Sequence, residues 1–352
     1  MDFTLTETRA MLSDSLRRTL QRGADWAALV DLGAPAALFS EEMGGFGGAG
    51  FDIALVFEEL GRACAVTPML DSCVLAGGLL ADCGEEAPVA AIIAGEAQAA
   101  LAHWEPGSRY APDPLMTVAQ PIGQGWQITG HKAVVVNAPE AGLILCSARM
   151  PEGAAGLFLL DRDAGGLDLR DTPLMGGGTA AEIDLRAVPA RLLHADASSL
   201  IEARIARAAL AQCAEALGLM QAIRDLTLDY LRTRTQFGRP IGQFQALQHR
   251  MADMLIEVEQ VRSAVINLAG QIDSDRVTRE RHVSAAKVLT GEVARLVCEE
   301  SIQMHGGIGL TEEYALGQRA IRLSMCDHRF GDIDHHLARF TELGRLTAET
   351  AP

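Results

Sequence analysis

The sequence contains no uninterrupted apolar run near the roughly 20 residues that a transmembrane helix needs, although 49% of its 352 residues are hydrophobic. Its first residues, MDFTLTETRAML, lack the basic and then apolar layout of a signal peptide. Seven cysteines are scattered without paired spacing, which fits reduced thiols better than a disulfide framework. We therefore expect a cytoplasmic protein that does not span a membrane.

Basic residues are also in deficit. There are 30 lysines and arginines against 46 aspartates and glutamates, so the formal net charge is −16. This excess of negative charge argues against non-specific binding of nucleic acid, and no nucleic-acid partner is expected. Any polyanionic ligand must depend on local basic residues.

The pattern of apolar residues changes twice along the chain. Residues 1–90 and 199–352 carry apolar positions at helical spacing, as Leu12, Leu16 and Leu20 illustrate. Residues 91–198 instead carry short strand-like runs between turn residues. The fold class is therefore α+β and mostly α, with an all-β unit between two helical regions. The predicted strands are residues 116–120, 126–129, 133–137, 143–147 and 157–161.

Five glycines lie between Met43 and Phe51, ahead of a helix predicted over residues 52–61. Such a loop could cradle a phosphate. However, no strand precedes it and no Lys-Ser/Thr pair follows it, as a phosphate-binding loop would require. A tight connection between helices is the favoured interpretation.

The most informative stretch is residues 230–254, YLRTRTQFGRPIGQFQALQHRMADM. It predicts a helix that ends near Arg234, a glycine-bearing turn, and a long amphipathic helix with apolar positions from Leu247 onward. The turn offers a guanidinium, side-chain amides and free backbone N–H groups at a helix N-terminus, which together suit the phosphates of a nucleotide. The simpler alternative is a corner between helices whose arginines are merely solvated.

A second glycine-bearing loop follows a long helix predicted over residues 277–300. Gly306, Gly307 and Gly309 in this loop could bring the backbone close to a phosphate. A helix C-cap is the alternative, but the neighbouring pattern of residues 230–254 favours a ligand site.

Both segments resemble the acyl-CoA dehydrogenase family. Residues 234–248 match its R-x-x-F-G-x-x-I-x-x-F-Q-x-x-Q pattern, and residues 303–314 match Q-x-x-G-G-x-G-x-x-x-E-Y. In that family both segments reach a flavin bound by the neighbouring subunit. The resemblance implies FAD, an acyl-CoA substrate, and three domains: residues 1–90 helical, 91–198 a β-barrel or sandwich, and 199–352 a four-helix bundle. It assigns cofactor binding to Arg234, Gln236, Phe237, Gln245, Gln303, Gly306 and Gly307.

The catalytic base of this family is not found. The reaction needs a carboxylate that removes the α-proton while the β-hydride goes to flavin N5. Counting without gaps from the family motifs puts Phe330 and Ala208 at the two positions where the resemblance places the base. No catalytic residue is therefore assigned, and Asp332 is the fallback. Other carboxylates nearby are Glu202, Glu215, Asp327 and Asp334.

The flavin contacts expected in the β region are also altered. HWEPGS (103–108) and GWQITGHKAVVVNA (125–138) resemble family segments. Trp104 stands where the family commonly has threonine, and valines at 134–136 stand where it has W-I-T. Ser108 is kept as a candidate contact to the CoA or flavin region.

The residues that match the family pattern are those that contact the flavin of a neighbouring subunit. The residues expected to contact the chain's own flavin and to supply the base differ from that pattern. This combination resembles the partner subunit of the heteromeric acyl-CoA dehydrogenases of actinobacterial steroid and related degradation. It implies a homologous partner subunit in a heterotetramer, with electron-transfer flavoprotein as electron acceptor. A self-sufficient homo-oligomer with a shifted base and a scaffold without flavin are the alternatives.

A metal site is a rival from a different chemical class. His328, Asp332 and His336 stand four apart, a spacing that one helix would align. Gly331 interrupts that run, and nothing else in the sequence supplies a convincing further ligand. No metal site is therefore expected.

Overall fold

The computed structural model describes residues 6–23, 25–110, 115–311 and 313–349 of the chain. It divides into two compact units, which we describe separately. The strand unit comprises residues 24–48 and 66–208, and the helical unit comprises residues 1–23, 49–65 and 209–352. N-terminal helices, a middle strand domain and a C-terminal helical domain follow one another along the chain, which confirms the predicted fold class. No helix among the described residues is long and apolar enough to cross a membrane.

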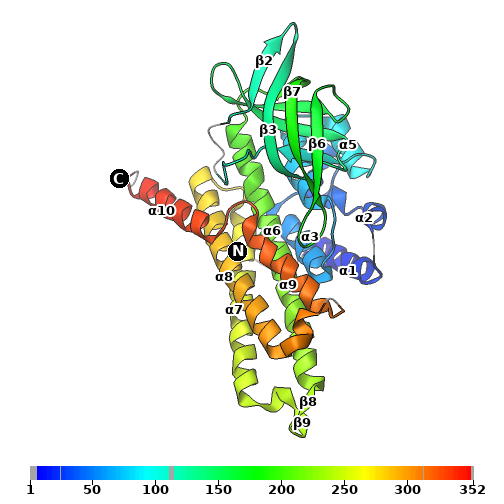
Figure 1. Cartoon of the computed structure of the whole chain (residues 1–352), viewed down its shortest axis with the longest axis vertical. Coiled ribbons are helices and arrows are strands. Elements are labelled where there is room, and N and C mark those ends of the chain that lie inside the picture. Colours follow the sequence, from blue (N-terminus) through cyan, green and yellow to red (C-terminus); the bar gives the residue numbers. More distant parts are fainter. Residues whose placement is uncertain (1–5, 24, 111–114, 312, 350–352) are drawn as a thin grey trace. The chain divides into compact units, whose positions relative to one another are not determined.

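The strand unit is built on one closed sheet (Figure 1). Its pairings run in the order β1-β4-β2-β3-β7-β5, β6 adds to β7, and β5 pairs back with β4. Ile128, Phe158 and Ile183 are fully buried in its interior. The strands are β1 (Ala99–Ala102), β2 (Val118–Ile122), β3 (Gly125–Val136), β4 (Leu143–Arg149), β5 (Ala155–Asp161), β6 (Leu167–Pro173) and β7 (Thr179–His194).

Each of the five predicted strands overlaps an observed strand, but residues 126–129 and 133–137 belong to the single strand β3. The register of β3 shifts between Lys132 and Val135, where Val134 has a φ of 52°. This bulge interrupts the alternation that marks a strand in the sequence. The sequence pattern does not predict β1, β6 or β7. β1 is buried along its whole length, so it shows no alternation of apolar and polar residues.

The glycine-rich loop of the strand unit folds back on its own backbone. A Cβ on Gly45 would stand 2.2 Å from the carbonyl oxygen of Phe39, and Gly44 and Gly48 are in left-handed conformation. The loop is therefore a tight connection, as the sequence predicts. The helices of this unit are α2 (Trp26–Asp31), η1 (Pro35–Leu38), η2 (Glu41–Met43), η3 (Met69–Gly77), α4 (Gly78–Asp82), α5 (Glu86–Ile93) and the first part of α6 (Ser198–Thr233).

The helical unit contains the long C-terminal helices. The apolar positions predicted on α7 face the interior, since Met251, Val258, Val261 and Val265 are buried. The elements are α1 (Glu7–Gln21), α3 (Gly50–Ala63), the rest of α6, β8 (Thr235–Gln236), β9 (Arg239–Pro240), η4 (Ile241–Gln243), α7 (Gln245–Gln271), α8 (Arg276–His305), η5 (Gly306–Leu310), α9 (Ala315–Met325), η6 (Cys326–His328) and α10 (Ile333–Glu349).

Two glycines let α3 and α6 cross with their backbones in contact. A Cβ on Gly61 would stand 2.0 Å from the carbonyl oxygen of Glu215, and one on Gly218 would stand 2.0 Å from that of Glu58. Only residues without a side chain allow this approach.

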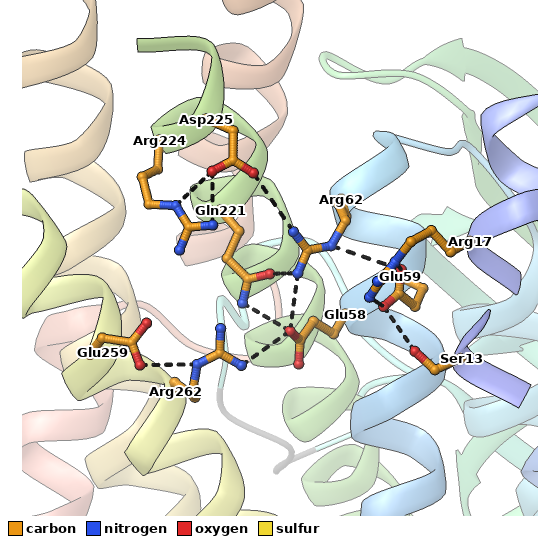
Figure 2. A network of polar contacts seen from close by, with 10 residues as sticks. All are labelled: Ser13, Arg17, Glu58, Glu59, Arg62, Gln221, Arg224, Asp225, Glu259 and Arg262. Carbon is orange, nitrogen blue, oxygen red and sulfur yellow. Dashed lines mark hydrogen bonds and ion pairs between the residues drawn. The ribbon is translucent and has the colours of Figure 1, made fainter. Parts of the chain in front are cut away.

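A network of charged groups surrounds this crossing (Figure 2). Arg62 in α3 is its centre and contacts Glu58, Glu59 and the fully buried amide of Gln221. Glu59 is also buried and accepts from Arg17 of α1 at 2.6 Å. Hydrogen bonds satisfy Gln221 and Glu59, whereas Nε of Arg62 reaches Glu59 only as an ion pair at 3.8 Å. The network ties α1, α3 and α6 together. Figure 2 also shows Ser13, Arg224, Asp225, Glu259 and Arg262, and the last two belong to α7.

Candidate functional site

The predicted cofactor residues lie at one end of the helical unit. We call the surface formed by residues 230–248, 303–311, 313 and 314 the bundle end. Figure 1 shows β8 and β9 at the end of α6, where the chain turns back into α7. Arg234, Gln236, Phe237 and Gln245 all belong to this turn and are exposed.

The glycine-bearing turn predicted from the sequence is a β-hairpin. Gln236 pairs with Arg239, and the two residues between them, Phe237 and Gly238, have φ values of 54° and 77°. Positive φ at both central residues fits a type I′ hairpin, in which glycine is favoured. The ring of Phe237 is 90% exposed. The guanidinium of Arg239 lies 4.2 Å from the centre of the Phe244 ring, which packs the hairpin against the start of α7.

This turn carries positive charge that no acidic group offsets. Arg232 and Arg234 are exposed, and neither guanidinium forms an ion pair with any other residue that the structure describes. α7 begins beside them, and no side chain caps its N-terminus. Unpaired guanidinium groups and free N–H groups at a helix start favour an anion. In a chain of charge −16, such a local surplus is the feature that a phosphate ligand needs.

The glycine loop belongs to the same end. α8 ends at His305, and Gly306 follows with φ 66° and ψ −148°, a conformation open essentially to glycine alone. Gln303, Gly306 and Gly307 are exposed there.

Aromatic side chains bring the hairpin and the glycine loop together. Tyr230, near the end of α6, stacks on His305 with ring centres 4.4 Å apart. His305 also contacts the hydroxyl of Tyr314, which follows the glycine loop, at 3.2 Å. The sequence analysis did not identify these three residues. The sequence offers only a weak indication of these residues, namely aromatic rings next to the hairpin segment and the glycine loop.

The positions expected for the catalytic base hold no carboxylate. Ala208 is fully buried in α6. Phe330 is buried in the helical unit with a φ of 60°. The fallback, Asp332, accepts a hydrogen bond from the backbone N–H of His335 at 2.9 Å and so caps the start of α10.

The segment that carries Phe330 is held firmly. Lys287 of α8 is buried and donates to the carbonyl oxygens of Cys326, Asp327 and Arg329 at 3.0, 3.4 and 2.7 Å. His336 donates from Nε2 to the carbonyl oxygen of Phe330 at 2.9 Å. A loop bound by two side chains in this way has little freedom to bring another residue to the position of Phe330.

Two of the other carboxylates near this segment lie inside the helical unit. Glu215 is buried and paired with Arg322 at 2.5 Å. Asp327 lies against α8, where its Oδ1 would be 2.4 Å from a Cβ on Gly291. Burial raises the pKa of the Asp327 carboxyl, and the charge of Lys287 opposes that shift.

In the strand unit, Glu105 fixes the turn that contains Ser108. Glu105 is buried and pairs with the fully buried ammonium of Lys132 at 2.8 Å. It also accepts from the backbone N–H groups of Met116 and Thr117. The Ser108 hydroxyl donates to the Glu105 carbonyl oxygen at 2.8 Å, so it closes its own turn.

The altered flavin contacts lie in the same unit. The carbonyl oxygen of Trp104 accepts from the N–H of Ala133, so this segment runs beside β3. Val134 is 60% exposed at the bulge of β3. The resemblance assigns positions 104, 134 and 136 to hydroxyl and aromatic groups, and here they hold an indole and two aliphatic side chains.

The residues of the metal hypothesis do not converge. His328 lies in η6 and Asp332 precedes α10, so the three residues do not share one helix. Both ring nitrogens of His336 are engaged, with Ser284 and with the Phe330 carbonyl. Within the described ranges, no group of three or more His, Cys, Asp or Glu side chains is arranged to hold a metal ion.

Comparison with known proteins identifies the family. The chain matches the acyl-CoA dehydrogenase N-terminal domain over residues 6–95 and the acyl-CoA dehydrogenase C-terminal domain over residues 198–330. The 3-sulfinopropanoyl-CoA desulfinase of Paraburkholderia xenovorans is 31% identical over 303 residues, which cover 80% of this chain and 77% of that protein. The chain therefore belongs to the acyl-CoA dehydrogenase family, whose members are FAD-dependent oxidoreductases that act on acyl-CoA. The predicted family, enzyme class and cofactor are confirmed.

Two solved structures are close in fold and in sequence. The Tcur3481-Tcur3483 steroid ACAD G363A variant is 28% identical with a TM-score of 0.89, covering 99% of this chain and 100% of that chain. The ChsE4-ChsE5 complex from Mycobacterium tuberculosis is 26% identical with a TM-score of 0.87, covering 100% of both chains.

Proposed function

We propose that this chain is a subunit of a heteromeric acyl-CoA dehydrogenase whose bundle end completes the FAD site of a homologous partner subunit. One observation carries the proposal. The bundle end has its polar and glycine residues in exposed positions, whereas Phe330 and Ala208 stand at the two positions that counting from the family motifs assigns to the base. The chain would thus serve α,β-dehydrogenation of an acyl-CoA thioester without removing the α-proton itself.

The bundle end fits the diphosphate and adenine half of FAD. Arg234 and the free N–H groups at the start of α7 would bind phosphate, Gln236, Phe237 and Gln245 would flank it, and Gln303, Gly306 and Gly307 would border the adenine half. FAD supplies the hydride acceptor of the reaction when it is bound. In the strand unit, Trp104 and the valines at 134 and 136 present no side-chain hydroxyl to a flavin, and we propose that this unit does not hold one. Ser108 would contribute only through its turn.

The relatives support this division of labour. The names of two similar structures each join two proteins, Tcur3481-Tcur3483 and ChsE4-ChsE5. The caffeyl-CoA reductase-Etf complex subunit CarC of Acetobacterium woodii, 26% identical, carries an electron-transfer flavoprotein in its name. A homologous partner in a heterotetramer, a steroid-type or related acyl-CoA substrate, and electron-transfer flavoprotein as acceptor are therefore parts of the proposal. All seven cysteines are free thiols, which fits the reducing cytoplasm that the proposal assumes.

A second candidate is a self-sufficient enzyme with a shifted base. The raised pKa of Asp327 favours it, because a base working near neutral pH needs a carboxyl whose pKa lies above the ordinary range. Asp327 suits this role better than Asp332, whose carboxylate caps α10.

Visible flavin absorbance distinguishes the candidates. The chain is purified alone and after co-expression with a related acyl-CoA dehydrogenase subunit from its genomic neighbourhood. We expect a colourless chain and a yellow complex that an acyl-CoA bleaches. Arg234→Ala in this chain should lower the flavin content of the complex. Arg295→Ala removes another exposed arginine, about 15 Å before the end of α8, and should leave the flavin content unchanged.

A yellow chain that an acyl-CoA reduces without a partner would overturn the proposal. Asp327→Asn would then be expected to abolish the reduction. A colourless complex with every related subunit would instead favour a scaffold without flavin.

A further inference from the structure

His305 is the last residue of α8 and lies between the two segments of the bundle end. It is 4% exposed. One face of its imidazole stacks on Tyr230, with ring centres 4.4 Å apart and planes inclined by 25°. Nε2 lies 3.2 Å from the hydroxyl of Tyr314. One ring therefore contacts the helix that leads into the hairpin and the residue that follows the glycine loop.

The hydrogen bonds of the ring define its tautomer. Nδ1 lies 2.8 Å from the carbonyl oxygen of Ser301, and a carbonyl can only accept, so Nδ1 carries the proton. Burial lowers the pKa of His305, which keeps the ring neutral. With the proton on Nδ1, Nε2 accepts from the Tyr314 hydroxyl, and the backbone of Leu226 also lies within hydrogen-bonding range of the ring. The ring is thus fixed in position and in orientation.

From these contacts we propose that His305 is a positioning residue that couples the hairpin to the glycine loop, so that Arg234 and Gly306 engage one FAD molecule together. The inference rests on the proposed function. It goes further in that it assigns a role in cofactor affinity to a buried residue that would not touch the cofactor.

The physical reason is pre-organisation. A ligand that contacts two segments binds tightly only if their spacing is already correct, because otherwise part of the binding free energy is lost in ordering them. The hairpin and the glycine loop are about 70 residues apart in sequence. Through its stack on Tyr230 and its bond with Tyr314, His305 fixes the distance between them.

The test uses the assembly that holds flavin, either the chain alone or its complex with a related subunit. Its flavin is removed, and the dissociation constant of FAD is measured by titration with fresh FAD. His305→Ala should raise this constant about tenfold or more. His305→Phe keeps a ring against Tyr230 but loses the acceptor for Tyr314, so it should be intermediate. Tyr314→Phe should match that intermediate loss, and the double variant should lose no more, because both changes remove the same hydrogen bond.

His282→Ala is the matched control. His282 lies on the same helix and makes the same local bond, from Nδ1 to the carbonyl oxygen four residues earlier, at 2.8 Å. Removal of the His282 ring should leave the dissociation constant of FAD unchanged. If His305→Ala fails to fold, the Phe variants at 305 and 314 still carry the test.

The outcomes separate this inference from the proposed function. If Arg234→Ala weakens FAD binding but His305→Ala and Tyr314→Phe do not, the positioning role is wrong and the proposed function stands. Additive losses in the double variant would also refute the coupling. If no assembly holds flavin, or Arg234→Ala has no effect, both proposals fail together.

Discussion

Gly218 in α6 allows a direct test of how the helical unit is assembled. A Cβ at this position would stand 2.0 Å from the carbonyl oxygen of Glu58 and 2.6 Å from the backbone nitrogen of Arg62, both in α3. Ordinary contacts of a Cβ begin near 3.4 Å. The obstructing atoms are backbone and cannot rotate away. Gly218→Ala must therefore push the two helices apart by roughly 1 Å.

One favourable effect and two unfavourable effects determine the change in stability. Alanine is favoured over glycine inside a helix by about 1 kcal/mol. Overpacking a tight contact costs about 1–3 kcal/mol and sometimes more. The separation also strains the hydrogen bond between Arg62 and the buried amide of Gln221, whose loss would cost about 1–3 kcal/mol. We expect a net destabilisation of about 2 kcal/mol, which corresponds to a Tm lower by roughly 4–8 °C.

Gly344→Ala is the matched control, because Gly344 is also a helix glycine and no atom of the described residues lies within 4 Å of its added Cβ. That change should leave the Tm unaltered or raise it slightly. Both variants and the wild type are melted in parallel, followed by circular dichroism at one scan rate, since unfolding of a chain this large can be irreversible. A Gly218→Ala protein that melts at or above the wild-type temperature would refute the backbone contact between α3 and α6.

Two further predictions concern backbone strain and pH. Gly306→Ala should cost about 1–3 kcal/mol of stability and weaken FAD retention, because Gly306 has φ 66° and ψ −148°. Gly307→Ala is the control for stability alone and should be neutral there, because Gly307 has no positive φ and no described atom lies within 4 Å of the added Cβ. Burial raises the pKa of Glu105, but the hydrogen bond from Lys132 and others outweigh it and lower the pKa from 4.5 to about 2. The resulting stability is present above pH 4.5 and is lost as the pH falls toward 2, and acid denaturation curves should show less of this dependence in Lys132→Met.

The helices could be predicted closely because their signals are local. The long helix α8 was predicted over residues 277–300 and runs from Arg276 to His305. Its actual end is set by the conformation of Gly306, and apolar spacing does not report that. β1 escaped prediction because it packs in the interior and pairs with β4, which lies more than 40 residues further along the chain. Burial on both faces removes the alternation from which a strand is recognised.

The two segments of the candidate site were predicted separately, but their assembly into one surface was not. Arg234 and Gly306 each belong to a motif that can be recognised from residue type and spacing. Their proximity depends on Tyr230 packing against His305, and no periodicity links residues so far apart in sequence. The hairpin geometry at Phe237 was missed for a different reason. Phenylalanine rarely adopts positive φ, so the sequence did not indicate a type I′ turn there.

The loop around Phe330 bears on the proposal that this chain does not supply a base. A segment that had only lost its function would be free to loosen, yet this one is bound by the buried ammonium of Lys287. His336 holds it as well, and a Cβ on Gly331 would stand 2.5 Å from Nε2 of that ring. Burying a lysine is costly unless its donors are satisfied, and here the backbone carbonyls of the loop satisfy them. The loop that carries Phe330 is therefore ordered and held by two side chains. An ordered loop with an apolar residue at this position is the arrangement expected of a subunit kept for assembly and cofactor binding rather than for proton removal.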